Sequence, residues 1–200
     1  MGSVLSLEIL RALSIAGGGA RLRVALERRS RSARVGRCVL STPHKVNRKN
    51  MPHQTTTAEG FTLSDDPERF DLRRAHGWID RSYWARGIPF EVFAKACANS
   101  LLVGAYLPDG TQVGMVRVVT DRASFAWICD VIVDEAHRGA GIGKSLMGYL
   151  KLHPDLQNLR RMHLVTRDAH GLYSQFGFGP LTGADLWMEI RDLDAYHLKR

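Results

Sequence analysis

The chain has 200 residues and a formal net charge of +8, and this length allows one domain with a full hydrophobic core. The charge is unevenly placed: residues 1–50 hold 11 Lys and Arg against 2 Asp and Glu, whereas residues 51–200 hold 17 against 18. The larger part is therefore nearly neutral and lacks the broad basic surface of a DNA- or RNA-binding protein. We expect no nucleic-acid partner.

Residues 1–58 differ in composition from the rest, and we expect a basic, disordered extension followed by one folded domain over residues 59–198. The Arg- and Ser-rich, acid-poor extension fits an organelle transit peptide, a basic arm, or an upstream extension of a protein whose translation starts at Met51. We favour the last, because the recognisable domain begins just after Met51. No apolar run approaches the ~20 residues of a membrane span, so we expect no membrane partner.

The cysteines and histidines show no pattern of a metal site. Cys38, Cys97 and Cys129 are widely spaced, and neither they nor the eight histidines have metal-ligand spacing. We therefore expect no metal, and a reducing, cytoplasmic location. Cys129 lies in an apolar run and is expected to be a small buried residue.

The apolar periodicity predicts alternating helices and strands, punctuated by glycine and proline. Gly87 and Pro89 separate two early helices, and Pro154 ends a later one. In chain order, the expected elements are a strand at 61–63, a helix from a cap at 64 or 65 to 79, a helix at 90–98, strands at 101–107, 112–120 and 125–133, a helix from a glycine-rich loop to about 150, a strand at 162–166, a short helix at 169–176 and a late strand at 186–190.

The glycine-rich loop is the most informative segment. Arg138 is followed by glycines at 139, 141 and 143, and then by an amphipathic helix. Backbone N–H groups at a helix start favour a bound anion, and glycine lets the backbone approach it closely. A P-loop would need glycine in place of Arg138, and the dinucleotide fingerprint would need a third glycine at Lys144 or Leu146. The pattern that remains is Arg-x-x-Gly-x-Gly between a strand and a helix.

This pattern, at Arg138, Gly141 and Gly143, resembles the coenzyme A loop of the GNAT superfamily of N-acetyltransferases. About 30 residues later, Leu-Tyr-x-x-Phe-Gly-Phe at 172–178 resembles the motif after the family's fifth strand. The resemblance covers roughly residues 60–190 and is nearest to a compact bacterial-type group, mostly of unassigned substrate. It implies a GNAT fold of the α/β (α+β mixed) class, with a central mixed, mostly antiparallel sheet of about six to seven strands and helices on both faces.

The resemblance implies acetyl-CoA as the acyl donor. The family opens a V between two parallel strands, where the pantetheine arm pairs with a strand edge and a backbone N–H near Val131 polarises the thioester carbonyl. Thr166 stands where family members often carry asparagine, and its hydroxyl offers one hydrogen-bond donor where the asparagine amide offers two. The residues expected to bind the cofactor are Val131, Ile132, Val133, Arg138, Gly139, Ala140, Gly141, Ile142, Gly143, Lys144, Ser145 and Thr166.

The resemblance also assigns Tyr173 as the acid that protonates the departing thiolate, since a tyrosine with a pKa near ~10 is protonated at neutral pH. An amphipathic core tyrosine is the alternative. Asp130 is a candidate base on the same strand face as Ile132, and a structural carboxylate bonded to backbone or arginine is equally consistent. There are three further candidate bases, Asp121, Asp168 and His170, but their positions are more typical of turn or helix-cap residues.

Tyr83 and Trp84 lie where the family covers its substrate, and they are expected to hold an amine by cation–π contact, with core packing as the alternative. The implied reaction is direct acetyl transfer to a primary amine of a small molecule in a ternary complex. The alternatives are a peptide or protein N-acetyltransferase and a non-catalytic acyl-CoA sensor. A homodimer is implied only because family members are often dimers.

Overall fold

The computed structural model describes residues 52–192 and 195–196. The expectations for residues 1–51 of the basic extension, for the start at Met51 and for Cys38 therefore lie outside the described residues.

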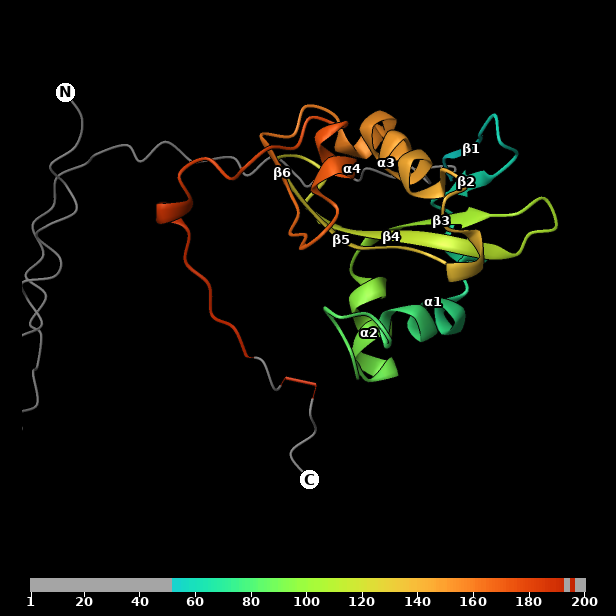
Figure 1. Cartoon of the computed structure of the whole chain (residues 1–200), viewed down its shortest axis with the longest axis horizontal. Coiled ribbons are helices and arrows are strands. Elements are labelled where there is room, and N and C mark those ends of the chain that lie inside the picture. The colour runs from blue at the N-terminus through green and yellow to red at the C-terminus, as the bar shows by residue number, and fades with distance from the viewer. Residues whose placement is uncertain (1–51, 193–194, 197–200) are drawn as a thin grey trace, which may run out of the picture. The chain divides into compact units, whose positions relative to one another are not determined.

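The described residues form one six-stranded sheet whose strands lie in chain order (Figure 1). All neighbouring strands are antiparallel except the last two, which are parallel. This confirms the expected mixed, mostly antiparallel sheet. The strands are β1 (Gln54–Thr56), β2 (Thr62–Ser64), β3 (Leu101–Tyr106), β4 (Gln112–Thr120), β5 (Phe125–Val133) and β6 (Arg161–His163).

Helices cover both faces of the sheet, as expected (Figure 1). On one face, α3 (Ile142–Leu152) buries Leu146 and Leu150 in the larger core cluster, and the short α4 (His170–Ser174) lies on the same side. On the other face, α1 (Leu72–Ile79) and α2 (Phe90–Ala98) bury a second cluster that includes Trp78 and Phe93. Each helix is amphipathic, and burial of its apolar face holds it against the sheet.

The start of the domain differs from the expectation. β1 was not expected; it pairs with β2 from Gln54 opposite Ser64 to Thr56 opposite Thr62. The single helix expected from residue 64 or 65 to 79 was wrong. A 3-10 turn, η1 (Pro67–Arg69), ends at Phe70, which is extended, and α1 then begins anew. The physical reason is a second cap: the Asp71 side chain accepts from the Arg74 N–H at 2.9 Å, which starts a new helix.

The late strand expected at 186–190 was also wrong. A 3-10 turn, η4 (Ala184–Leu186), occupies its beginning, and residues 188–190 pair with no described strand. The apolar, β-favouring sequence is present, but a strand also needs a neighbour to complete its hydrogen bonds.

A buried polar pair attaches β1 and β2 to the end of α3. One oxygen of Asp65 accepts from the His53 N–H at 2.5 Å, and the other lies 2.9 Å from Nε2 of His153. His153 is only 1 % exposed, and its Nδ1 accepts from the Asp155 N–H. Since one ring nitrogen accepts, the other carries the proton and donates to Asp65.

We expect Asp65→Ala to lower the free energy of unfolding by about 1–3 kcal/mol, because it leaves the buried Nε2–H of His153 without an acceptor. Urea denaturation followed by tryptophan fluorescence measures the change. The matched control is Glu59→Ala on the exposed β1–β2 loop, which is expected to change stability by less than ~0.5 kcal/mol. Equal effects of the two variants would contradict this role of Asp65.

Candidate active site

β5 and β6 separate shortly after they meet. They pair only between Phe125–Trp127 and Arg161–His163, whereas β5 continues to Val133. Among the described residues, no strand therefore pairs with residues 128–133 on the β6 side, and their backbone N–H and C=O groups on that edge can pair with an extended ligand. β5 and β6 thus separate where the family resemblance predicts a V-shaped opening between two parallel strands.

A β-bulge interrupts the unpaired part of β5. Met115 pairs with Ile132 and Arg117 pairs with Cys129, so Asp130 and Val131 together oppose the single residue between Met115 and Arg117. Asp130 has φ of +49°, a left-handed conformation that is uncommon outside glycine. Such outliers persist only where the surrounding structure enforces them, and they cluster at functional sites.

The bulge decides which way the side chains of β5 point. Before it, Ala126 and Ile128 lie in the core cluster beneath α3. After it, Val131 and Val133 pack against that cluster, whereas Ile132 packs against the cluster beneath α1 and α2. The extra residue thus turns Asp130 out of the α3 core and onto the same face as Ile132. This agrees with the expected shared face, although strict alternation alone would have placed Ile128 there as well.

Asp130 is held by two donors. Arg117 Nε lies 2.6 Å from Oδ2, and Trp84 Nε1 donates to Oδ1 at 3.1 Å. Arg117 also donates to Ser100 Oγ. Burial alone would lower the pKa of the Arg117 guanidinium, but the Asp130 carboxylate outweighs it and raises that pKa. These contacts match the reading of Asp130 as a carboxylate bonded to arginine, and its action as a base stays a prediction.

Arg117 was missed from the sequence. A charged residue in the middle of the apolar run at 112–120 is the signal that could have found it, because buried arginines need a paired anion. The partner itself could not be chosen from the sequence.

A cavity of about 370 Å³ opens between β5 and the segment that follows β6. It brings together six of the expected site residues: Tyr83, Trp84, Asp130, Val131, Thr166 and Tyr173. The two aromatic residues come from the loop between α1 and α2, Asp130 comes from the β5 bulge, and Tyr173 comes from α4.

Tyr83 and Trp84 are 45 % and 43 % exposed, so they wall the cavity rather than fill a core. Their rings meet edge to face at 4.9 Å. Tyr83 also contacts the opposite side: its Oη accepts from the Arg167 N–H at 3.3 Å, and the Arg167 guanidinium lies 3.9 Å from the ring centroid. The α1–α2 loop is thereby tied to the loop before α4 across the cavity.

Tyr173 lies half-buried in the cavity wall. Burial raises the pKa of its hydroxyl, and the nearby Tyr83 and Asp168 raise it further. The phenol is therefore fully protonated at neutral pH and can donate. Thr166 has a different part: its Oγ1 accepts from the Ala169 N–H at 3.0 Å and orders the start of α4.

The glycine-rich loop meets the requirements of an anion site. Gly139 and Gly141 have φ near +84° and +83°, and a Cβ atom added at either position would meet no atom of the described residues within 4 Å. Gly141 caps α3, and no side chain of the described residues caps the helix there, so its first N–H groups remain available to an anion. Gly143 differs, because a Cβ atom there would lie in ordinary contact with Leu172 and Val133.

The other loop residues lie around this site in different ways. Ile142 is buried, so it offers only its backbone N–H. Arg138 reaches back to the Val133 carbonyl at 3.4 Å and stays exposed, as do Lys144 and Ala140. Ser145 Oγ donates to the Gly141 carbonyl at 3.3 Å. Arg138 also forms an exposed ion pair with Glu135 at 3.5 Å. Exposed ion pairs are weak, so the side chains of Arg138 and Lys144 can both turn toward a phosphate.

The remaining candidate bases are placed less centrally. Asp121 accepts from the N–H groups of Ala123, Ser124 and Phe125 in the β4–β5 turn, so it is a turn residue. Asp168 lines the cavity but is well exposed. His170 lines a neighbouring cavity instead.

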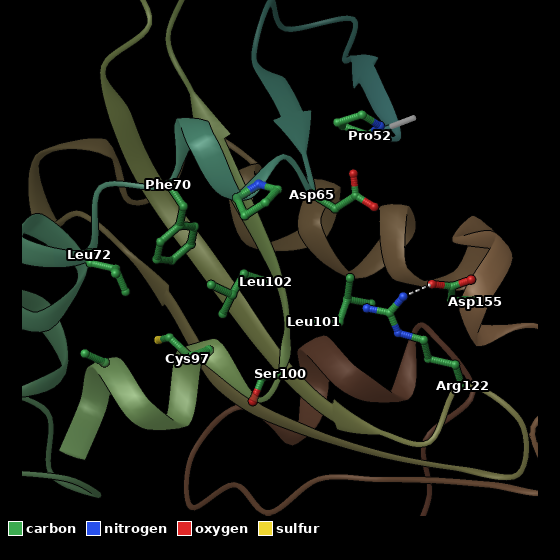
Figure 2. Close-up of a pocket in the computed structure, with 13 residues that line it drawn as sticks. Pro52, Asp65, Phe70, Leu72, Cys97, Ser100, Leu101, Leu102, Arg122 and Asp155 are labelled. Atoms are coloured by element: carbon green, nitrogen blue, oxygen red, sulfur yellow. Dashed lines mark ion pairs between the residues drawn. The ribbon is translucent and has the colours of Figure 1, made fainter. Parts of the chain in front are cut away.

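A further cavity of about 360 Å³ lies on the α2 side of the sheet and contains none of the expected site residues (Figure 2). Phe70, Leu72 and Leu102 give it an apolar wall, and an ion pair between Arg122 and Asp155 lies at one end.

Within residues 52–192 and 195–196, no three His, Cys, Asp or Glu side chains lie together as a metal site would require. No helix in the same residues has the length and apolar character to cross a bilayer.

Comparison with known proteins agrees with this geometry. Residues 99–180 match the family described as the acetyltransferase (GNAT) domain. The crystal structure of a GNAT-family protein from Xanthomonas campestris pv. campestris is 39 % identical, covers 73 % of this chain and 98 % of its own, and superposes with a TM-score of 0.65. GNAT family protein SP0256 from Streptococcus pneumoniae TIGR4 is 25 % identical over 66 % of this chain and 97 % of its own, with a TM-score of 0.51.

A curated relative from Gibberella zeae, named Putative acetyltransferase FG08082, is 26 % identical over 144 residues, which are 61 % of this chain and 80 % of the relative. The residues that match the family, 99–180, include the glycine-rich loop and the opening between β5 and β6.

We expect Gly141→Trp to weaken acetyl-CoA binding at least ~100-fold, which corresponds to about 2.7 kcal/mol, because the indole would stand where the helix N–H groups meet the pyrophosphate. Isothermal titration calorimetry measures the change. Gly110→Trp is the matched control: Gly110 has φ of +87° and equally open surroundings in the β3–β4 turn, so the backbone strain is the same. A similar loss in both variants would contradict binding at the loop.

Proposed function

This chain belongs to the GNAT acetyltransferase family, and on that premise we propose that it transfers the acetyl group of acetyl-CoA to a primary amine of a small molecule, by direct attack in a ternary complex. The observation that carries the proposal is one shared space. The unpaired edge of β5 opens into the same cavity that holds Asp130, Tyr83 and Tyr173.

The thioester donor fits this space from end to end. The N–H groups of residues 139–144 receive the pyrophosphate, and the exposed side chains of Arg138 and Lys144 turn toward it. The pantetheine arm pairs as a short strand with the edge at Val131–Val133. Val131 belongs to the bulge and lines the cavity, and its N–H is the proposed donor that polarises the thioester carbonyl.

The chemical step then balances with the groups present. The amine nitrogen attacks the carbonyl carbon, a C–N bond forms, and the C–S bond breaks. The thiolate takes the proton of the Tyr173 hydroxyl, and the tyrosine regains a proton from the solvent or from the amine. An alkyl ammonium has a pKa of about 10.4, so it must lose one proton before attack. Asp130, the less exposed of the two carboxylates that line the cavity, attracts the ammonium and can receive that proton on a free lone pair.

The cavity walls favour a small cationic acceptor. Trp84 and Tyr83 present aromatic surface to an ammonium, and Asp130 supplies the negative charge. The contact of Tyr83 with Arg167 narrows the space across which a bulky protein segment would have to pass. These features support a small-molecule amine over a protein acceptor.

We expect Tyr173→Phe to lower kcat by at least about 100-fold, because general-acid catalysis is worth 10²–10⁴. Acetyl-CoA affinity should not change, since the ring remains. The raised pKa gives a second readout: a group that donates in its protonated form fails only above its pKa, so the wild-type kcat should still hold at about pH 10, where an ordinary tyrosine is half ionised, and fall only at higher pH. A variant with unaltered kcat would exclude Tyr173 as the acid.

We expect Asp130→Asn to lower kcat/KM for the amine at least about tenfold while the dissociation constant of acetyl-CoA stays constant. A raised KM alone would identify a binding role, and a lowered kcat would identify proton transfer. Asp121→Asn is the control, because its carboxylate serves only the β4–β5 turn. Thermal unfolding of both variants separates these effects from loss of the Arg117 pair. Unchanged turnover would remove Asp130 from the site.

A further inference from the structure

The cavity around Asp130 contains one charged side chain that the proposed reaction does not use. Arg191, from the segment after η4, lines the same cavity as Asp130 and Tyr173. The residue is exposed, and no acidic side chain of the described residues lies within ion-pair distance of it. Its guanidinium group is therefore available to a ligand in the cavity.

Contacts on either side fix the course of the segment that carries Arg191. Before it, the Trp187 ring lies 4.7 Å from the His163 ring on β6. After it, Tyr196 packs against the core cluster beneath α1 and α2. Figure 1 shows the segment leading from the level of β6 to that of α2. Arg191 thus lies on a stretch of chain that passes from one wall of the cavity to the other, since these walls are the segment after β6 and the α1–α2 loop.

The charges around the cavity do not cancel. Asp130 faces the cavity, but its charge is already matched by Arg117, whose Nε lies at 2.6 Å. Arg167 and Asp168 also line the cavity and form a pair, with 4.0 Å between the guanidinium and the carboxylate. These five side chains therefore carry three positive charges against two negative ones, and Arg191 supplies the excess.

This balance restricts the kind of amine that the cavity accepts. An ammonium group can lie against Asp130 and Trp84, but a second positive charge on the acceptor would be repelled by Arg191. A negative charge on the acceptor would instead cancel the excess. Because a guanidinium can donate two parallel hydrogen bonds to a carboxylate, Arg191 is well suited to bind one.

On the basis of the acetyl transfer proposed above, we propose that the acceptor is an amine that also carries a carboxylate, as an amino acid does. Its amine lies at Asp130 and the thioester, and Arg191 binds its carboxylate. A carboxylate is favoured over a phosphate ester, because one negative charge matches the single excess charge of the cavity, whereas a phosphate close to −2 exceeds it. Arg191 is then the residue that determines acceptor specificity.

Steady-state kinetics with matched acceptors tests the role of Arg191 in the full-length chain. Two pairs of probes differ by one carboxylate: phenylalanine with 2-phenylethylamine, and 4-aminobutyrate with propylamine. In at least one pair, kcat/KM should be at least about tenfold higher for the acid, because a charge-assisted hydrogen bond is lost with the carboxylate. Added salt should reduce this preference, because it screens exposed charges.

Three substitutions separate the charge of Arg191 from a structural role. Arg191→Gln should reduce the preference for the acid to less than about threefold, whereas Arg191→Lys, which keeps the charge, should retain most of it. Arg160→Gln is the matched control, at an exposed arginine beside the start of β6 that does not line the cavity, and should behave as the wild type. The dissociation constant of acetyl-CoA should be the same in all three variants, because the glycine-rich loop does not line this cavity.

The outcomes distinguish this specificity from the acetyl transfer itself. Equal kcat/KM for acid and amine in both pairs, or an equal loss for both in Arg191→Gln, overturns the role of Arg191 and leaves the acetyl transfer standing. A weaker affinity for acetyl-CoA in Arg191→Gln also overturns it, since Arg191 would then serve the donor. A wild-type chain that binds acetyl-CoA but acetylates none of the four amines would overturn the proposed function, and the specificity with it.

Discussion

The early separation of two parallel strands is the constraint on which the site depends. β5 and β6 are joined at three residue pairs, and β5 then continues for six residues without a partner on that side. A full-length pairing would have saturated the backbone groups that a thioester donor needs and closed the cavity. Because α4 follows β6, the separation also places Tyr173 on one wall and Asp130 on the other.

The bulge at Asp130 is the second half of this arrangement. A buried carboxylate without partners is strongly destabilising, and strict alternation would have directed Asp130 into the apolar core beneath α3. One extra residue turns it toward Arg117 and Trp84 instead. Val131, the neighbouring residue of the bulge, lines the same cavity. A strained backbone at φ of +49° thus serves the placement of a charge.

Features encoded locally were predictable from the sequence. The glycine spacing marks the loop, in which Gly139 and Gly141 take positive φ, and the helix after it follows from its apolar spacing. Features that depend on distant partners were not. The bulge depends on the register between β5 and β4. The role of Arg117 depends on its ion pair with Asp130. Residues 186–190 have strand propensity, but no described strand lies beside them to pair with. The cap at Asp71 was a local signal that was overlooked.

Hydrogen exchange with and without acetyl-CoA tests the central claim most directly, because it reports on individual backbone N–H groups. If the donor lies between the separated strands, exchange slows at residues 131–133 and 139–144, whereas β3, already paired on both edges, does not change. Protection confined to the cavity beside α2, around Phe70 and Leu102, or no protection on the β5 edge, would contradict it.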